Sequence, residues 1–418
     1  MSIREIYEYY SREDVQKALL EIAKNREVVG VSINGSFLKR PDSINYPQDI
    51  LALLKKGAVE FHCSIERWLN PTAITDADHM RIGWDLIFDI DCELFEHGKI
   101  ATSVFIWGLK EHGIKNISIK FTGGSGFHIG IPWESIPKSI DYKDSKLLYP
   151  DLARKIIVYL KDFVSERLEK AFLANYSPEE LASQVKKPLG LIMTDTGINP
   201  YQIVDIDPIL VSPRHLFRMP YSLNAKTGLV SLPIDPEYLD DFKKEQADPK
   251  LVKTEVKFLK NFDENEAELL ILKAIDWHAK REKLGKKISK KVVLKKRVEK
   301  ENFPPCIKKI LNGLADGRKR SVFILINFLR SLKWEWDDIE NLMKEWNSKN
   351  TPPLRETYLT SQIRWHKRQN KTVLPANCLT DGWYKDFGVC EPDNICKGGT
   401  NEIKIKNPVN YPFKKMKK

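Results

Sequence analysis

Residues 84–92 read Trp-Asp-Leu-Ile-Phe-Asp-Ile-Asp-Cys, and the rest of the sequence is interpreted outward from them. The β-branched and aromatic residues of this stretch predict a strand, in which side chains two positions apart project from the same face. Asp89 and Asp91 should therefore lie side by side. Asp85 shares that face and could be mistaken for a third member of the group.

Two neighbouring carboxylates repel each other unless a cation lies between them, and ligation by oxygen atoms alone suits Mg²⁺ or Mn²⁺. Asp89 and Asp91 therefore fit a two-metal site for phosphoryl transfer. The Asp-x-Asp pattern is common, so a structural or surface role for the pair stays open.

Short β-rich runs surround this stretch and alternate with helical runs. The β-rich runs are residues 59–63, 86–92, 117–121 and 128–131, with a helical pattern at about 100–112. This order predicts an α/β sheet domain. Helical periodicity returns after residue 150, which predicts a helical insertion at about 150–195.

Helical patterns also occupy both ends of the chain. A helix is expected after Ser11, and two more are expected around 322–329 and 336–346, where apolar residues recur at helical spacing. The segment from Arg281 to Lys300 contains ten Lys and Arg and two Glu. Such an excess of positive charge is typical of a linker, a solvated helix end or a segment that contacts nucleic acid.

We therefore expect a catalytic domain at 1–280, a basic linker at 281–300 and a second, mainly α-helical domain at 301–418.

The composition excludes several classes of protein. Of 418 residues, 42% are hydrophobic, which is too many for a disordered polymer. Lys and Arg number 68 against 57 Asp and Glu, and this net charge of +11 favours a polyanionic partner such as nucleic acid or nucleotide. No apolar signal segment follows Met1, and the longest apolar run is too short to cross a membrane. We expect a cytoplasmic, nucleoid-associated protein without membrane contact.

A glycine-rich turn lies between two of the expected strands, at residues 121–129. Its glycines, including Gly123 and Gly126, would let the backbone approach a ligand closely. Thr122, Ser125 and His128 can donate hydrogen bonds to phosphate oxygens. A hairpin loop without a ligand would explain the glycines equally well, although it would not explain a histidine that returns directly into the strand.

A third polar segment, residues 204–228, combines acidic and basic groups. Asp205 and Asp207 form another carboxylate pair on one face, and Arg218 and Lys226 follow among hydroxyl side chains. Acidic side chains suited to a metal ion and basic side chains suited to a triphosphate thus occur in one segment. Taken alone, the segment could also be a salt-bridged loop.

In this order the three segments resemble the catalytic subunit of archaeo-eukaryotic DNA primases. The resemblance implies that family's fold, an α/β (α+β) catalytic domain with mixed β-sheets. It implies that Asp89, Asp91 and Asp207, or alternatively Asp205, hold two Mg²⁺ or Mn²⁺ ions. It further implies nucleotide-binding roles for the following residues: Thr122, Gly123, Ser125, Gly126, His128, Arg218 and Lys226. Two positions depart from the family pattern: Thr122 replaces the usual Ser, and Asn224 replaces the usual His.

The cysteines suggest a second metal centre. Cys306, Cys378, Cys390 and Cys396 are separated by 72, 12 and 6 positions, which is not the spacing of a zinc finger. From spacing alone they could bind zinc, bind an iron–sulfur cluster or be scattered core residues.

The sequence around these cysteines resembles the C-terminal domain of the primase large subunit. That resemblance implies a [4Fe–4S] cluster on the four cysteines, with structural Zn²⁺ as the alternative. It also implies that Arg318, and less directly Arg320, contact the template and the triphosphate of the initiating nucleotide. Trp365 and His366 could stack on bases.

Together the two resemblances imply a single-chain archaeal primase that makes short primers de novo on single-stranded DNA for replication. The implied partners are the template strand, primer–template duplex and nucleoside triphosphates, with a replicative helicase and a DNA polymerase as further candidates, and the protein is expected to be a monomer. Two alternatives remain: a primase-polymerase that mainly extends primers in repair, and a non-catalytic protein that binds single-stranded nucleic acid.

Overall fold

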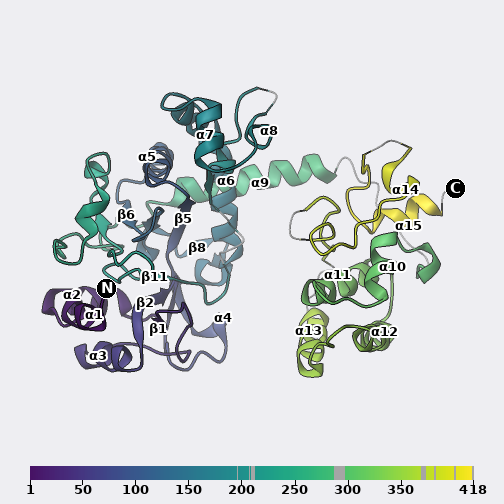
Figure 1. Ribbon diagram of the computed structural model, residues 1–418, viewed down its shortest axis with the longest axis horizontal. Coiled ribbons are helices and arrows are strands. Elements are labelled where there is room, and N and C mark those ends of the chain that lie inside the picture. The colour runs from purple at the N-terminus through teal and green to yellow at the C-terminus, as the bar shows by residue number, and fades with distance from the viewer. Residues whose placement is uncertain are drawn as a thin grey trace. The chain divides into compact units, whose positions relative to one another are not determined.

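The structure is a computed structural model in which the chain forms two compact units, Met1–Ile288 and Ser289–Lys418 (Figure 1). It describes residues 1–194, 196–206, 208, 212–286, 297–368, 373–380, 383–399 and 402–416. Each unit is described separately below. None of the helices in the described residues is both long enough and apolar enough to span a bilayer.

The first unit combines helices with short strands. Its helices are α1 (Ile3–Tyr10), α2 (Glu13–Ala23), α3 (Pro47–Lys55), α4 (Ala77–Met80), α5 (Phe95–Glu111), α6 (Asp151–Leu173), α7 (Pro178–Gln184), α8 (Leu189–Ile192) and α9 (Glu268–Lys286). Its strands are β1 (Val28–Ser32), β2 (Ala58–Ser64), β3 (Glu66–Trp68), β4 (Arg81–Trp84), β5 (Leu86–Cys92), β6 (Ser118–Phe121), β7 (Phe127–Ile131), β8 (Ser139–Ile140), β9 (Lys143–Asp144), β10 (Val204–Asp205), β11 (Leu216–Arg218) and β12 (Pro233–Ile234).

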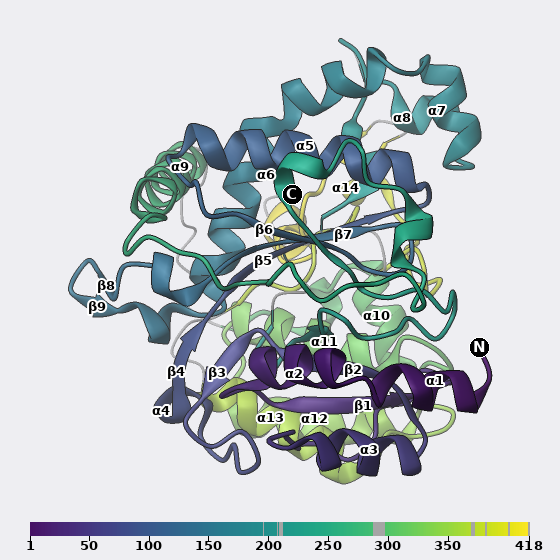
Figure 2. The same ribbon diagram turned by 90° about the vertical axis from the view of Figure 1, so that its left-hand side faces the viewer.

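Two sheets organise this unit. A five-stranded sheet has the order β10-β5-β7-β6-β12, and a three-stranded sheet has the order β1-β2-β11. Helices α5 and α6 lie on one side of the larger sheet, and the smaller sheet with α1, α2 and α3 lies on the other (Figure 2). The α+β class is therefore confirmed. All strand pairs in the described residues are antiparallel, whereas mixed sheets were expected.

The strand that opened the sequence analysis is the centre of this fold. β5 pairs with β7 on one side and with β10 on the other, and its apolar side chains from Leu86 to Ile90 are buried. α5 begins at Phe95, a turn earlier than the expected start near residue 100. A further helix, α1, was not predicted. It begins with a capping box in which the Ser2 hydroxyl accepts from the Glu5 backbone and the Glu5 carboxylate accepts from the Ser2 backbone.

The second unit is mainly helical, as expected. Its helices are α10 (Pro305–Leu311), α11 (Arg318–Ser331), α12 (Trp336–Ser348), α13 (Glu356–Arg368), α14 (Asn394–Lys397) and α15 (Asn410–Lys415). α11 supplies the largest share of a separate apolar core, to which α12 contributes Trp346 and α13 contributes Ile363. Among the described residues between α13 and α15, α14 is the one helix and no strand is present.

Candidate functional site

Three carboxylates lie on one face of the five-stranded sheet. Asp89 and Asp91 are two positions apart on β5, and Asp205 on β10 is the register partner of Asp91. Burial, together with the nearby charges of Asp89 and Asp205, raises the pKa of Asp91 to about 6. The carboxylates therefore repel one another, and a bound cation would relieve this repulsion.

Asp207, the preferred third carboxylate of the sequence analysis, lies outside the described residues. Its alternative, Asp205, is exposed at the end of a short strand beside Asp91. Asp205 is thus the carboxylate that the structure brings next to the β5 pair.

Asp85, which directly precedes β5, has a structural role. It is fully buried and forms ion pairs with Arg26 at 2.5 Å and Arg67 at 2.6 Å, and it accepts a hydrogen bond from the backbone of Trp133. With both oxygens engaged in this network, Asp85 is not available as a metal ligand.

A row of side chains crosses the sheet beside the carboxylates. His128 on β7 is the register partner of Asp89 on one side and of Lys120 on the other. Nε2 of His128 lies 3.1 Å from Oδ1 of Asp89, but no hydrogen bond satisfies that buried oxygen within the described residues. Burial and the charge of Lys120 lower the pKa of His128 to about 4, so its imidazole is neutral at pH 7.

Lys120 is a residue that the sequence analysis missed. It is fully buried, donates to the hydroxyl of Ser231 at 2.8 Å and lies over the rings of Phe217 and Phe258. Burial and the charge of Arg218 lower its pKa from 10.5 to about 7. The only signal for Lys120 in the sequence was its position directly before the glycine-rich turn.

Replacing Lys120 with Met should remove a pH dependence of stability. Because the pKa of Lys120 is lower in the folded protein, the unfolded chain binds more protons between about pH 7 and pH 10.5, so the free energy of unfolding should rise with pH in this window. The rise from this one group is at most about 1.4 kcal/mol per pH unit. Urea denaturation at pH 7 and pH 9 measures it.

Lys120→Met should have a flatter profile than the wild type, while the exposed control Lys110→Met should keep the wild-type slope. Equal slopes in all three proteins would show that folding does not lower the pKa of Lys120.

The glycine-rich turn packs closely against β5. A Cβ added at Gly126 would lie 2.3 Å from the Ile90 carbonyl oxygen, and Gly123 has a φ of +82°. The Thr122 hydroxyl donates to the Gly126 carbonyl and the Ser125 hydroxyl donates to the Cys92 carbonyl. Both hydroxyl groups thus donate within the fold in this structure.

Backbone groups of the turn are better placed to meet a ligand. In the part of the chain that the structure describes, the N–H groups of Gly124 and Ser125 donate to no other group. Successive free N–H groups in a turn form an anion-binding concavity. These two lie in the turn that follows β6 and packs on β5 beside Asp91.

Arg218 joins the two sheets at this turn. It lies on β11 and donates one N–H to the Thr122 carbonyl at 2.9 Å and another to the Glu60 carboxylate at 3.0 Å. Burial would raise the pKa of Glu60, but His62, Arg218 and the Ala225 N–H lower it to about 2. The sequence analysis also missed Glu60. Glu60 and His62 are two positions apart on β2, so their side chains lie on the same face of that strand. Lys226, in contrast, is exposed.

In the second unit the four cysteines converge. Cys306, Cys378, Cys390 and Cys396 line one small cavity together with Tyr384. Burial, with the neighbouring thiols, raises the pKa of Cys378 to about 12, and burial raises that of Cys396 to about 11. Four largely protonated thiols therefore face one space. As they stand, no three His, Cys, Asp or Glu side chains among the described residues are arranged to hold a metal ion in either unit.

Arg318 and Arg320 lie at the start of α11. The helix follows Gly317, whose φ is +73° and where a Cβ would lie 2.5 Å from the Phe387 ring. Arg318 donates to the Pro352 carbonyl, and Arg320 lies over the Phe387 ring at 5.1 Å. The N-terminal N–H groups of α11 and two guanidinium groups thus lie at the same end of this helix, and both kinds of group can bind anions.

Of the two aromatic residues that could stack on bases, only one is exposed. Trp365 is 50% exposed, whereas His366 is buried in the core of the second unit beside Asn327. Burial therefore excludes base stacking by His366.

Comparison with known proteins connects this geometry to two families. Residues 92–236 match the family model of the DNA primase small subunit. Residues 296–396 match that of the eukaryotic and archaeal DNA primase large subunit, C-terminal domain. Two separate segments of one polypeptide thus match the models of these two DNA primase families.

Several archaeal proteins are similar to parts of the chain. The DNA primase small subunit PriS of Pyrobaculum aerophilum is 30% identical over 189 residues, which are 40% of this chain and 57% of that protein. An uncharacterised protein of Methanocaldococcus jannaschii, MJECS07, is 24% identical over 284 residues, which are 64% of this chain and 62% of that protein. The chain thus spans about three fifths of the length of each of these two relatives.

Two solved structures also show some similarity. The polymerase domain of Mycobacterium tuberculosis ligase D in complex with DNA is 16% identical, with 66% of this chain and 89% of that chain covered and a TM-score of 0.38. Primase RepB′ is 11% identical, with 85% and 95% covered and a TM-score of 0.35.

Proposed function

We propose that this protein is a DNA primase that synthesises short primers de novo on single-stranded DNA from nucleoside triphosphates. The observation that carries the proposal is the row of carboxylates on β5 and β10. Asp205 lies within the match to the small-subunit family and Asp89 and Asp91 lie directly before it, in a chain that also matches the large-subunit family. Template strand, primer–template duplex and nucleotides would be its ligands, and a helicase and a DNA polymerase further partners.

The carboxylate site fits divalent metal ions. It offers only oxygen ligands, an unsatisfied buried Oδ1 on Asp89 and a crowded Asp91 whose pKa is raised. Asp89, Asp91 and either Asp205 or Asp207 would hold two Mg²⁺ or Mn²⁺ ions. When bound, such ions activate the attacking hydroxyl and stabilise the leaving pyrophosphate.

The protein's own groups would position the nucleotide. The free N–H groups of Gly124 and Ser125 would receive the triphosphate, with Thr122, Gly123 and Gly126 shaping the turn. Neutral His128 lies beside Asp89 without adding charge, and Arg218 anchors the turn to β2 and β11. Exposed Lys226 would reach the phosphates from the segment after β11.

The second unit would serve initiation. Its four converging thiols fit a [4Fe–4S] cluster, which is bound by four cysteine thiolates. Zinc remains the alternative cofactor. Arg318 and Arg320 at the start of α11 would bind the triphosphate of the first nucleotide or the template.

Synthesis on an unprimed single-stranded template tests the proposal. Purified protein with labelled nucleotides and Mg²⁺ or Mn²⁺ should yield short products that begin with a 5′-triphosphate. Products from a primed template alone would replace the proposal with a role in primer extension. Binding without any synthesis would favour a non-catalytic protein.

A further inference from the structure

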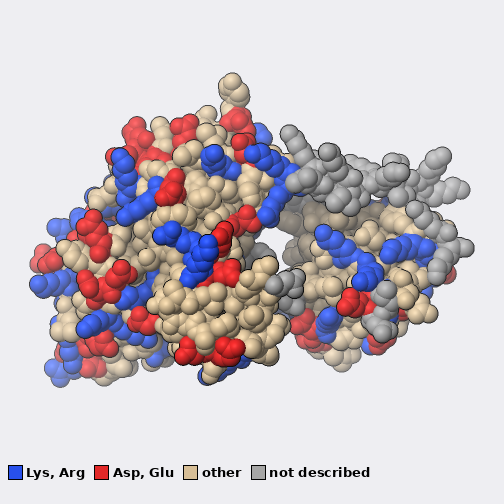
Figure 3. All heavy atoms as spheres, turned by 90° about the horizontal axis from the view of Figure 1, so that it is seen from above, with Lys and Arg blue, Asp and Glu red and all other residues tan. Residues whose placement is uncertain are grey.

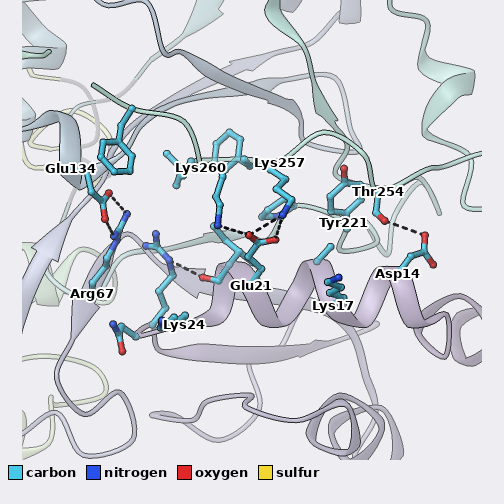
Figure 4. Close-up of a pocket in the computed structure, with 18 residues that line it drawn as sticks. Asp14, Lys17, Glu21, Lys24, Arg67, Glu134, Tyr221, Thr254, Lys257 and Lys260 are labelled. Atoms are coloured by element: carbon cyan, nitrogen blue, oxygen red, sulfur yellow. Dashed lines mark hydrogen bonds and ion pairs between the residues drawn. The ribbon is translucent and has the colours of Figure 1, made fainter. Parts of the chain in front are cut away.

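A second cavity in the first unit is separate from the carboxylate site. It has a volume of about 610 Å³ and lies between α2 and the segment 254–262 (Figure 4). None of Asp89, Asp91, Asp205, His128 or Arg218 lines it. Its size suits a ligand as large as a nucleotide.

Each carboxylate of this cavity already has a cationic partner. Glu21 accepts from both Lys257 and Lys260, at 3.0 and 2.8 Å, as Figure 4 shows. Glu134 pairs with Arg67 at 2.6 Å. The third, Asp14, pairs with Arg12 at 2.7 Å and also accepts a hydrogen bond from the Thr254 hydroxyl. These carboxylates are therefore neutralised before any ligand binds.

Two lysines of the cavity remain uncompensated. Lys17 and Lys24 line it, are exposed and, among the described residues, have no ion-pair partner. Lys17 lies on α2, and Lys24 directly follows the last residue of that helix, Ala23. Glu21 lies between them and shares its charge between two further lysines. The lining thus carries an excess of positive charge directed at one space.

Apolar groups complete the cavity. Ile22, Pro220, Phe258 and Phe262 line it, and the side chain of Phe262 is 43% exposed. In a nucleotide site, cations bind the phosphate and an exposed aromatic ring can stack on the base. On the face of the molecule in Figure 3, by comparison, Lys and Arg are interspersed with Asp and Glu, so charge there marks no single ligand.

We propose that this cavity binds a nucleotide phosphate, either of a free nucleotide or within a nucleic-acid strand, as a second site next to the catalytic face. Its occupant would contact Pro220, two residues after Arg218, and Phe258, whose ring lies under the Lys120 ammonium. The inference does not depend on catalysis, because the cavity shares no residue with the carboxylate site.

Hydrogen–deuterium exchange on the full chain tests this inference. ATP in metal-free buffer and a single-stranded oligonucleotide are the two probes, and the backbone at 13–26 and 254–262 is the readout. Either probe should slow exchange in both segments. Protection by ATP assigns the site to free nucleotides, and protection by the oligonucleotide alone assigns it to a strand. Absence of protection in both segments with both probes would overturn the inference.

A pair of matched double variants makes the test specific. Lys17→Ala with Lys24→Ala should remove the protection and weaken binding of the protecting probe about tenfold. Lys55→Ala with Lys56→Ala, at the exposed end of α3, removes the same charge outside the cavity and should retain wild-type protection. Equal weakening in the two double variants would show general charge attraction instead of a site.

Discussion

Replacing Asp89 with Ala is expected to reduce primer synthesis by about a thousandfold or more, while single-stranded DNA binding stays within about twofold. Asp89 carries the buried oxygen that lacks a hydrogen bond, so its removal would take away one of the proposed metal ligands. Binding should persist because Lys and Arg side chains neutralise the DNA backbone. Product formation and fluorescence anisotropy measure the two quantities separately.

The matched control is Glu96→Ala, which removes an exposed carboxylate from the start of α5. It should leave synthesis unchanged. Residual synthesis by Asp89→Ala above about a tenth of the wild-type rate would contradict the assignment of the site. Asp205→Ala and Asp207→Ala are compared in the same assay. The variant whose loss of synthesis is as large as that of Asp89→Ala identifies the third carboxylate.

The arrangement along β5 was predictable from the sequence because strand geometry is local. Alternation alone placed Asp89 and Asp91 on one face, and the turn that leads into His128 returned the chain beside them. The same alternation placed Asp85 on their face but could not show that it is engaged by Arg26 and Arg67, because these partners lie far away in the sequence.

Groups that depend on distant packing could not be predicted. Arg218 and Glu60 are 158 residues apart, and the pairing of β11 with β2 in the smaller sheet brings them together. Lys120 looks like a solvent-exposed charge in the sequence, since lysines are rarely buried, and its burial follows from the segment that contributes Phe258. The opening helix α1 was missed because its capping residues, Ser2 and Glu5, stand at the very start of the chain.

The cysteines show how resemblance and geometry differ as sources of prediction. Spacing alone could not separate zinc, a cluster or scattered core positions. The structure brings Cys306, Cys378, Cys390 and Cys396 around one cavity, which excludes the scattered arrangement. The choice between zinc and iron depends on chemistry that neither the sequence nor the side-chain positions supply.

Replacing Cys378 with Ser is expected to abolish cluster binding and de novo initiation while extension of an annealed primer is retained. Burial keeps the thiols of the cavity protonated, so ionised ligands are stable there only with a metal bound. Loss of one ligand should lower iron from about four atoms per chain to less than one in protein purified without oxygen. Iron analysis, visible absorption and the two synthesis assays give the result.

Cys63→Ala is the control, because Cys63 is buried in the first unit and lies outside the thiol cavity. It should retain iron and initiation. A wild-type protein that contains zinc and no iron would replace the cluster with a structural ion, yet Cys378→Ser should still lose initiation. If Cys378→Ser instead loses its metal and initiates normally, the second unit has no part in starting primers. Arg318 and Arg320 would then be left without their proposed role, because it requires this unit to hold the first nucleotide.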